Sequence, residues 1–282
     1  MSKITENKKQ IWLEKFDCFE INGKDSKRFL NGITTGNIFD VNNKVLKTCW
    51  LSPNGVLKSL LEINFLENKL EVIVFVGNTI EIRKYFNDLI FPSDDVSLSE
   101  TFSINRIQEV DYKNSWKINQ PIFLKNEDKA YAFYKNNLNN INTNDLQLWK
   151  INQAIPSLDN EINGKNNPLE LGLADLIDFN KGCYLGQETM SKIRKVSSLK
   201  QEIRVWTSKD SVFNLEAANK TIYSNYQKEK TVGYITSIYK LGSQTTKGLA
   251  MIKRKYLDGE NTFFIDNHCQ ISIDKSLGST FL

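Results

Sequence analysis

The amino-acid sequence predicts an α+β fold with mixed or antiparallel sheets and a small β-barrel at the C-terminal end. Strand-like and helix-like hydrophobic patterns are interleaved through the first half of the chain. Two strand patterns, Leu57–Phe65 and Leu70–Val76, are separated by only a short turn, so they predict an antiparallel hairpin. A hairpin excludes a strictly repeated parallel unit, and the short β-rich runs after Gln201 are typical of a barrel.

The first predicted elements are a strand and a helix. The strand is expected to end near Ile21, and Asp25 or Ser26 can begin the helix. A second strand, Lys47–Leu51, precedes the hairpin, and the sequence Ser52-Pro53-Asn54-Gly55 between them predicts a turn.

Helical spacing returns twice before the barrel. Thr79 begins a helix that ends before Pro92, and Leu146–Ile155 forms another, which a proline stops. Between these helices, residues 94–133 are expected to hold short strands and the Asn-rich stretch 135–145 a loop or boundary.

The chain is long enough for more than one structural unit, and we expect three regions. Residues 1–145 form an N-terminal α+β region, residues 146–200 continue it, and residues 201–282 form the barrel. The predicted barrel strands are Ile203–Thr207, Thr231–Ile238, Gly248–Lys253, Thr262–Ile265 and Gln270–Ile273.

Composition and charge exclude several classes of protein. Apolar residues make up 40% and charged residues 25% of the chain, which are globular values. The net charge of +4 is too small to indicate nucleic-acid binding. No apolar run is long enough to span a membrane, and the polar start of the chain lacks the apolar core of a signal sequence. A cytoplasmic protein is therefore expected, with an organellar location left open.

The cysteines and the single histidine limit the available chemistry. Four cysteines, at positions 18, 49, 183 and 269, show no Cys-x-x-Cys spacing, and His268 is the only histidine. A closed zinc site is therefore not expected, and no metal ligands are assigned. A nucleophile pair of Cys183 and His268 stays open as a minor alternative.

The stretch Lys181–Glu188, KGCYLGQE, has the composition of a functional site. Gly182 and Gly186 flank the thiol of Cys183, and Gly186 is expected to lead into a helix over Gln187–Ile193. The Lys181 cation and the helix dipole would both favour the thiolate, which is the reactive form. The alternative is a turn in which Cys183 is a small apolar plug.

KGCYLGQE resembles, nearly letter for letter, the signature of the YgfZ-type folate-binding proteins, which are relatives of the T-protein (aminomethyltransferase) of the glycine cleavage system. Four further stretches are similar to the same family, and they are Phe19–Thr35 (FEINGKDSKRFLNGITT), Lys150–Pro156 (KINQAIP), Pro168–Ile177 (PLELGLADLI) and Val232–Ile252 (VGYITSIYKLGSQTTKGLAMI). The resemblance implies a T-protein-like multi-domain fold around a central cavity, with Cys183 exposed near its mouth.

By the same resemblance, the cofactor is tetrahydrofolate or another folate derivative. A pterin needs a narrow apolar slot with a polar end, and the glutamate tail needs cations. In T-proteins a glutamate in the segment matching Lys150–Pro156 holds the pterin, and an arginine shortly before the cysteine motif contacts folate. This chain has Asn152 or Gln153 at the first place and Phe179 or Lys181 near the second.

Other side chains complete the expected folate site. Trp149 and Tyr184 are candidate ring-facing aromatics, with a role in the core as the alternative for each. Gln187 and Glu188 are further candidates, although Glu188 could instead cap the helix. Three cations after the motif could hold the glutamate tail or form a solvated helix face, and they are Lys192, Arg194 and Lys195.

The expected reaction class depends on one departure from the T-proteins. They carry a Gly-x-x-Asp-Asp run whose aspartate is catalytic, and the matching run here is Gly55-Val56-Leu57-Lys58-Ser59. A lysine cannot replace a positioned carboxylate, so aminomethyl transfer by the T-protein route is expected to be lost.

The resemblance therefore implies a folate-binding accessory protein with a functional thiol at Cys183. Its expected role is to support the assembly or repair of iron–sulfur clusters, including those of enzymes that modify tRNA. One alternative is a folate-dependent aminomethyl or other one-carbon transferase, and another is a binding scaffold in which Cys183 is structural. Direct nucleic-acid binding and membrane association are not expected.

Overall fold

The structure is a computed structural model that describes residues 9–40, 44–137, 139–196, 199–209, 220–241, 245–259, 262–265 and 269–274. The chain divides into two compact units. Unit 1 consists of Met1–Thr48 and Ser59–Leu146, and unit 2 of Cys49–Lys58 and Gln147–Leu282. The short stretch Cys49–Lys58 thus belongs to the second unit, which sequence periodicity does not indicate.

A mixed sheet makes up most of unit 1, and its strands are β1 (Gln10–Asn22), β2 (Val45–Leu51), β3 (Leu57–Phe65), β4 (Leu70–Val76), β5 (Ser97–Leu98), β6 (Phe102–Glu109), β7 (Ile122–Leu124) and β8 (Asn139–Asn140). The end of β2 and the start of β3 fall within the stretch that belongs to unit 2. The strand order is β2-β3-β4-β1-β6-β7, and β5 and β8 also pair with β1. β1 runs antiparallel to β4, β5 and β6 and parallel to β8. The predicted hairpin of β3 and β4 and the mixed sheet are confirmed.

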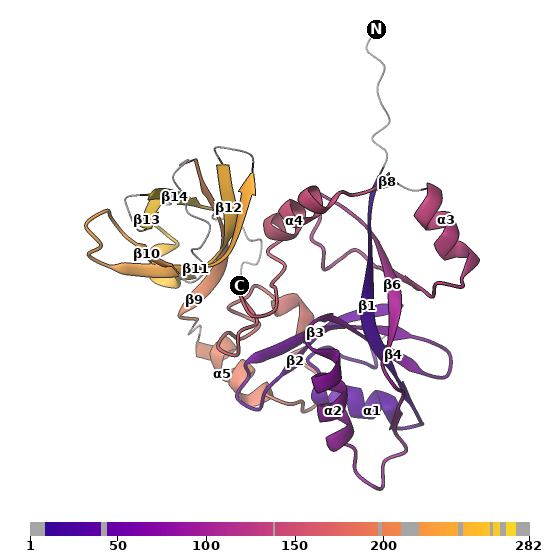
Figure 1. Cartoon of the computed structure of the whole chain (residues 1–282). Coiled ribbons are helices and arrows are strands. Elements are labelled where there is room, and N and C mark those ends of the chain that lie inside the picture. Colours follow the sequence, from indigo (N-terminus) through magenta and orange to yellow (C-terminus); the bar gives the residue numbers. More distant parts are fainter. Residues whose placement is uncertain are drawn as a thin grey trace. The chain divides into compact units, whose positions relative to one another are not determined.

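Two helices, α1 (Ser26–Ile33) and α2 (Thr79–Asp88), cover one face of this sheet (Figure 1). The ring of Phe86 on α2 packs edge-on against Phe19 of β1 at 5.8 Å and against Phe29 of α1 at 6.2 Å. The side chain of Asn78 accepts hydrogen bonds from the backbone of the first turn of α2, so this helix begins at Thr79 as predicted.

The region after β7 differs from the prediction. Helix α3 (Lys129–Asn137) replaces part of the expected strands and loop, and α4 (Thr143–Asn152) begins three residues before the predicted start. The side chain of Asn142 accepts a hydrogen bond from the backbone N–H of Asp145 at 2.9 Å and donates one to its carboxylate at 2.6 Å. This reciprocal cap starts α4 inside the Asn-rich stretch, where composition alone indicated a loop.

Unit 2 contains a 3-10 turn, η1 (Ala174–Leu176), a helix, α5 (Gln187–Val196), and the barrel. The barrel strands are β9 (Gln201–Ser208), β10 (Thr221–Tyr223), β11 (Thr231–Leu241), β12 (Thr245–Lys253), β13 (Thr262–Ile265) and β14 (Cys269–Ile273), with η2 (Arg254–Tyr256) after β12. They close in the order β10-β11-β12-β9-β14-β13, which confirms the predicted barrel. Its interior is a packed core of apolar side chains that includes Trp206, Ile235 and Ile271.

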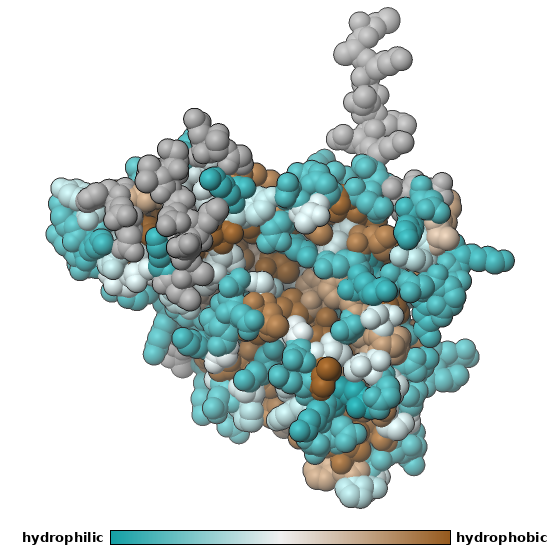
Figure 2. All heavy atoms as spheres, in the orientation of Figure 1, coloured by the Kyte–Doolittle hydropathy of each residue, from teal (hydrophilic) through white to brown (hydrophobic). Residues whose placement is uncertain are grey.

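The visible face of the molecule is mostly hydrophilic, with apolar residues showing between polar ones (Figure 2). This agrees with the charged fraction of 25%. In the described part of the chain, the helices are all too short or too polar to cross a bilayer.

Candidate functional site

The cysteine motif forms a turn that leads into α5. Cys183 is the exposed thiol of the chain, whereas Cys18, Cys49 and Cys269 are buried. The turn is closed by a hydrogen bond from the backbone N–H of Gln187 to the carbonyl of Tyr184 at 3.1 Å. The helix begins at Gln187, as the sequence predicted, so Cys183 lies one turn before its N-terminus.

Gly186 holds this turn against the turn between β2 and β3. Its backbone has a φ of +82°, and a Cβ there would lie 2.8 Å from the Ser52 carbonyl oxygen and 3.2 Å from the Gly55 Cα. Gly55, with a φ of +75°, is equally close, because a Cβ there would lie 2.9 Å from the Cβ of Thr189 on α5. Both positions need glycine for their conformation and for the close approach.

The turn that Gly186 contacts is itself well ordered by hydrogen bonds. The backbone N–H of Gly55 donates to the Ser52 carbonyl at 2.9 Å, and the N–H of Val56 donates to the Ser52 hydroxyl at 3.2 Å. The segment that carries Cys183 therefore packs against the turn at Ser52 and Gly55, and Gly55 begins the run that the resemblance aligned with the catalytic run of T-proteins.

The two positions at which the resemblance to T-proteins implies carboxylates, Lys58 and Ser59, hold no anion here. Lys58 is exposed at the start of β3. Ser59 is fully buried, and its hydroxyl donates to the carbonyl of Val76 at 2.7 Å. Neither side chain can act as an anionic group in catalysis.

Lys181 and Tyr184 form a buried pair beside the exposed thiol. The Lys181 ammonium lies 5.1 Å from the centre of the Tyr184 ring, and the two residues are 8% and 6% exposed. Burial lowers the pKa of Lys181 to about 8, against the opposing effect of Asp178. The Lys181 ammonium thus lies over the Tyr184 ring, whereas the sequence predicted that it would act on the sulfur of Cys183.

The Tyr184 hydroxyl is buried and has no hydrogen-bond partner among the described residues. Burial, with smaller electrostatic contributions from Cys49 and Asp178, raises the pKa of this group to about 12, so it keeps its proton at neutral pH. A buried donor without a partner is costly, and a ligand oxygen or nitrogen would satisfy it.

The cations of α5 lie mostly on its outer face. Arg194 and Lys195 occupy the last turn and Glu188 the first, an order that complements the helix dipole. The guanidinium of Arg194 also stacks on the ring of Phe179 at 4.3 Å. The resemblance to T-proteins implied an arginine near position 179 of the sequence. This chain has Phe179 there, and the guanidinium of Arg194 from α5 lies on its ring.

The predicted folate residues of α4 lie in different surroundings. Trp149 is 1% exposed, which favours the alternative of a role in the core. The Asn152 side-chain carbonyl accepts a hydrogen bond from the Lys247 ammonium of β12 at 3.1 Å, and Gln153 is half-buried.

Two buried polar residues in the loop after α4, Glu161 and Asn166, could not be predicted from the sequence. The carboxylate of Glu161 accepts hydrogen bonds from the hydroxyls of Ser157 at 2.8 Å and of Ser237 at 2.6 Å. The backbone N–H of Leu57 donates to the Asn166 carbonyl at 2.9 Å. These bonds fix the loop within unit 2, and their long sequence separations leave no local signal.

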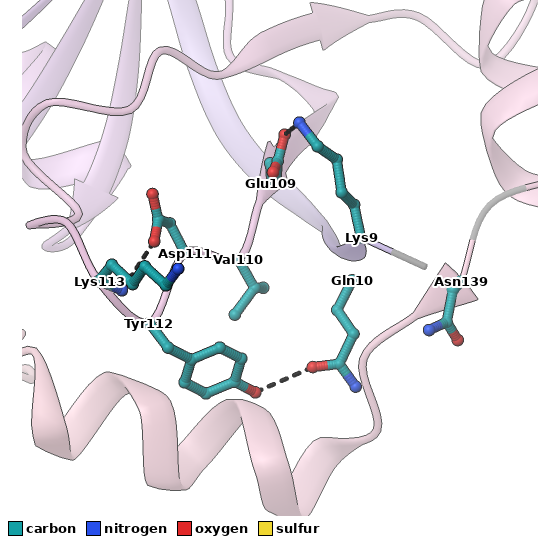
Figure 3. A pocket seen from close by; sticks show the side chains of 8 residues that line it. All are labelled: Lys9, Gln10, Glu109, Val110, Asp111, Tyr112, Lys113 and Asn139. Atoms are coloured by element: carbon teal, nitrogen blue, oxygen red, sulfur yellow. Dashed lines mark hydrogen bonds and ion pairs between the residues drawn. The ribbon is translucent and has the colours of Figure 1, made fainter. Parts of the chain in front are cut away.

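A cleft of about 570 Å³ lies on unit 1, and Figure 3 shows its lining side chains, which are Lys9, Gln10, Glu109, Val110, Asp111, Tyr112, Lys113 and Asn139. The Lys9 ammonium pairs with the Glu109 carboxylate at 2.9 Å, and the Tyr112 hydroxyl donates to the Gln10 side chain at 2.9 Å. The cleft contains none of the residues predicted from the sequence, and its mixed charges favour no particular ligand.

Metal and nucleophile-pair chemistry gain no support from the described residues. No group of three or more His, Cys, Asp or Glu side chains comes together among them as a metal site. His268, the alternative partner of Cys183, lies outside the described residues.

Comparison with known proteins identifies the fold. No protein-family profile matches the sequence. Over 115 residues, or 40% of this chain, it is 32% identical to the Arabidopsis thaliana protein named "Putative transferase At1g60990, chloroplastic", and the matched stretch spans only 25% of that protein. The structure superposes on the glycine cleavage system aminomethyltransferase T of Bartonella henselae with a TM-score of 0.73, over 98% of this chain and 87% of that chain, at 10% identity. The chain therefore has a T-protein-like fold, as the resemblance implied.

Proposed function

We propose that this protein is a folate-binding accessory protein of the YgfZ type, which keeps the T-protein fold without its aminomethyl-transfer chemistry. The main support for the proposal is the set of side chains around the turn between β2 and β3, where a thiol is present and the expected carboxylates are absent. Exposed Lys58 and buried Ser59 stand where the carboxylates are expected, and the segment packed on the same turn presents an exposed thiol, Cys183.

The ligand is tetrahydrofolate or a derivative. The Tyr184 hydroxyl offers a buried donor to the ligand, and the Lys181 ammonium offers a partly desolvated cation next to it. Arg194, stacked on Phe179, adds a planar cation suited to the carboxylates of the glutamate tail. Asn152, Gln153, Gln187 and Glu188 remain further contacts in this proposal, and Trp149 supports the site from the core.

The accessory role consists of supporting the assembly or repair of iron–sulfur clusters in cytoplasmic enzymes, including those that modify tRNA. An exposed thiol at the start of a helix can bind iron or react as thiolate, which a hydroxyl cannot do near neutral pH. Partner enzymes would reach Cys183 because the thiol and Gly182 beside it are both exposed.

Two measurements test the two halves of this proposal. Titration calorimetry is expected to detect tetrahydrofolate binding, and Tyr184→Phe is expected to weaken it because the buried donor is lost. In a reconstituted glycine cleavage assay the protein is expected to be inactive. Full turnover in that assay would overturn the non-enzymatic half, and no heat of binding would overturn the folate half.

The role of the thiol is tested by complementation of a strain that lacks its own homologue. Cys183→Ser is expected to keep fold and folate affinity but to lose the recovery of iron–sulfur enzyme activity and of thiolated tRNA. Asn180→Ser, an exposed change three residues away, serves as the control and is expected to rescue fully. Rescue by Cys183→Ser at matched protein level would leave only the scaffold alternative.

A folate-dependent one-carbon transferase is the second candidate, because the Arabidopsis relative is named as a transferase. It requires a carboxylate supplied from another position. Transfer from a methylene or formyl folate to an acceptor, followed by mass spectrometry, distinguishes the two candidates.

A further inference from the structure

Unit 1 buries a cluster of charged side chains on the sheet face opposite α1 and α2. Arg106 on β6 pairs in register with Glu14 of β1, and Glu62 on β3 pairs with Ile73 of β4. The Arg106 side chain is 0% and that of Glu62 is 1% exposed. The proposed function uses none of these groups.

The guanidinium of Arg106 is held on two sides. Its Nε donates to one carboxylate oxygen of Glu62 at 2.7 Å, and its Nη2 donates to the other at 2.9 Å and to the side chain of Gln108. The rings of Trp12 and Phe75 lie 4.5 Å and 4.8 Å from the guanidinium carbon. These rings exclude water from the cation and strengthen its electrostatic interactions.

One donor of Arg106 remains unused. Its Nη1 is buried and has no hydrogen-bond acceptor within the part of the chain that the structure describes. Leaving a buried charged donor unsatisfied costs free energy, and native structures rarely do so without a bound water or ion.

A second cation lies near the same carboxylate. Lys47 on β2 is 6% exposed, and its ammonium donates to the backbone carbonyl of Asn119 at 2.5 Å. Burial lowers the pKa of Lys47 to about 8, while the Glu62 charge raises it and the Arg106 charge lowers it. Lys47 therefore lies within electrostatic reach of both groups and is mostly charged at pH 7.

The buried charges that interact here are two cations and one carboxylate. The Glu14 carboxylate opposite Arg106 is exposed, and the buried carboxylate of Glu71 accepts a hydrogen bond from the Asn64 amide. Arg106 takes up both oxygens of Glu62, so the Lys47 ammonium is the surplus charge. An unbalanced buried charge typically costs more free energy than a lost hydrogen bond. A single small anion would neutralise the surplus charge and satisfy the unused donor together.

We propose that this cluster binds a monovalent anion of about the size of chloride, in contact with Arg106 Nη1 and close to the Lys47 ammonium. The chemistry fits a small anion because the donors are fixed by the sheet and enclosed by aromatic rings. The site is a property of unit 1 alone and does not depend on folate binding.

Thermal unfolding of the full chain tests the proposal. The melting temperature is measured while sodium chloride replaces sodium gluconate at constant ionic strength. An anion bound to the folded state is expected to raise the melting temperature by about 3–5 °C for each tenfold rise in chloride above the dissociation constant. Equal melting temperatures in chloride and gluconate would overturn the proposal.

Two variants and one direct measurement complete the test. Lys47→Met removes the surplus charge and is expected to abolish the chloride dependence, whereas Lys58→Met, at an exposed lysine, is expected to keep it. In crystals of the natural protein soaked in bromide, an anomalous peak is expected beside Arg106 Nη1. An ordered water at that position with no bromide would overturn the proposal, even if the Lys47 variant fails to fold.

Discussion

Each unit buries one lysine, and the two lysines differ in what their surroundings allow. Lys47 in unit 1 and Lys181 in unit 2 are 6% and 8% exposed, and burial lowers the pKa of both to about 8. Lys47 lies in a sheet core with a carboxylate and a guanidinium. Lys181 lies over the Tyr184 ring, two residues from an exposed thiol. Burial therefore lowers the pKa of both lysines by a similar amount, although one lies in an interior charge cluster and the other beside an exposed thiol.

Removing the carboxylate of the unit 1 cluster is expected to have the largest effect. Glu62→Gln leaves Arg106 and Lys47 buried without their counterion, and breaking a buried pair in this way costs about 3–5 kcal/mol of unfolding free energy. Urea unfolding followed by tryptophan fluorescence measures the loss. The control is Glu100→Gln, which breaks the pair of Arg83 with a carboxylate that is 90% exposed and is expected to change little.

A similar loss for both glutamate variants would contradict the distinction between interior and surface charges. It would mean that the cluster of unit 1 is not desolvated in solution.

The pH dependence of the unfolding free energy is expected to report the lowered pKa of the buried lysines. A pKa of about 8 in place of 10.5 for Lys47 corresponds to roughly 3 kcal/mol of destabilisation at pH 7, so Lys47→Met is expected to stabilise the protein by up to that amount. Between pH 8 and 10.5 the unfolded chain binds more protons than the folded one. The unfolding free energy of the natural protein therefore rises with pH across this range, and its gap from the variant shrinks.

Denaturation curves of both proteins at pH 7, 8.5 and 10, in gluconate to exclude chloride binding, measure this gap. Lys181→Met is expected to show the same pH trend and also to weaken folate binding, which Lys47→Met should leave unchanged. A gap that stays constant with pH would show that the folded-state pKa of Lys47 is not lowered.

The contact between the cysteine motif and the β2–β3 turn is expected to have an intermediate effect. Gly186→Ala places a Cβ 2.8 Å from a backbone oxygen at a φ of +82°, and such strain costs about 1–3 kcal/mol. The variant is also expected to change the alkylation rate of Cys183 by iodoacetamide, because the segment must shift. Gly182→Ala is the matched control, since a Cβ there meets no atom within 4 Å. Equal behaviour of the two variants would show that the turn does not position the thiol.

The smallest effect is expected at the end of α4. Ala154 has a φ of +48°, and the backbone N–H groups of Ala154 and Ile155 donate to the carbonyls of Ile151 and Lys150, as in a glycine-terminated helix. Ala154→Gly is expected to stabilise the protein by about 1 kcal/mol because glycine adopts this conformation without strain.

The same substitution in unit 1 is expected to have the opposite sign. Ala132→Gly, inside the exposed helix α3, should lower stability by about 1 kcal/mol. The melting temperature is expected to rise for Ala154→Gly and to fall for Ala132→Gly. A fall for both variants would show that Ala154 is not strained.

Features that depend on local pattern could be predicted from the sequence. The hairpin, five of the six barrel strands and the helix that begins at Gln187 follow from periodicity and from glycine and proline positions, because these act over a few residues. The strand β10 was not predicted, because three residues are too few to show a pattern. The cysteine motif was also evident in the sequence, and the resemblance to T-proteins pointed to Lys58 and Ser59 as the positions where carboxylates are missing. The start of α4 was not predicted, because the capping residue Asn142 lies among many other asparagines and the sequence does not distinguish it from them.

The contacts between distant side chains could not be predicted and depend on how the chain folds. Strand register brings Arg106 to Glu62 across 44 positions, and helix packing brings Arg194 onto Phe179. The burial of Trp149 and the contact of Gly186 with Ser52 likewise depend on chain folding. Periodicity indicates which face of an element is apolar, but a specific partner is set by register and packing, which act between elements far apart in the sequence.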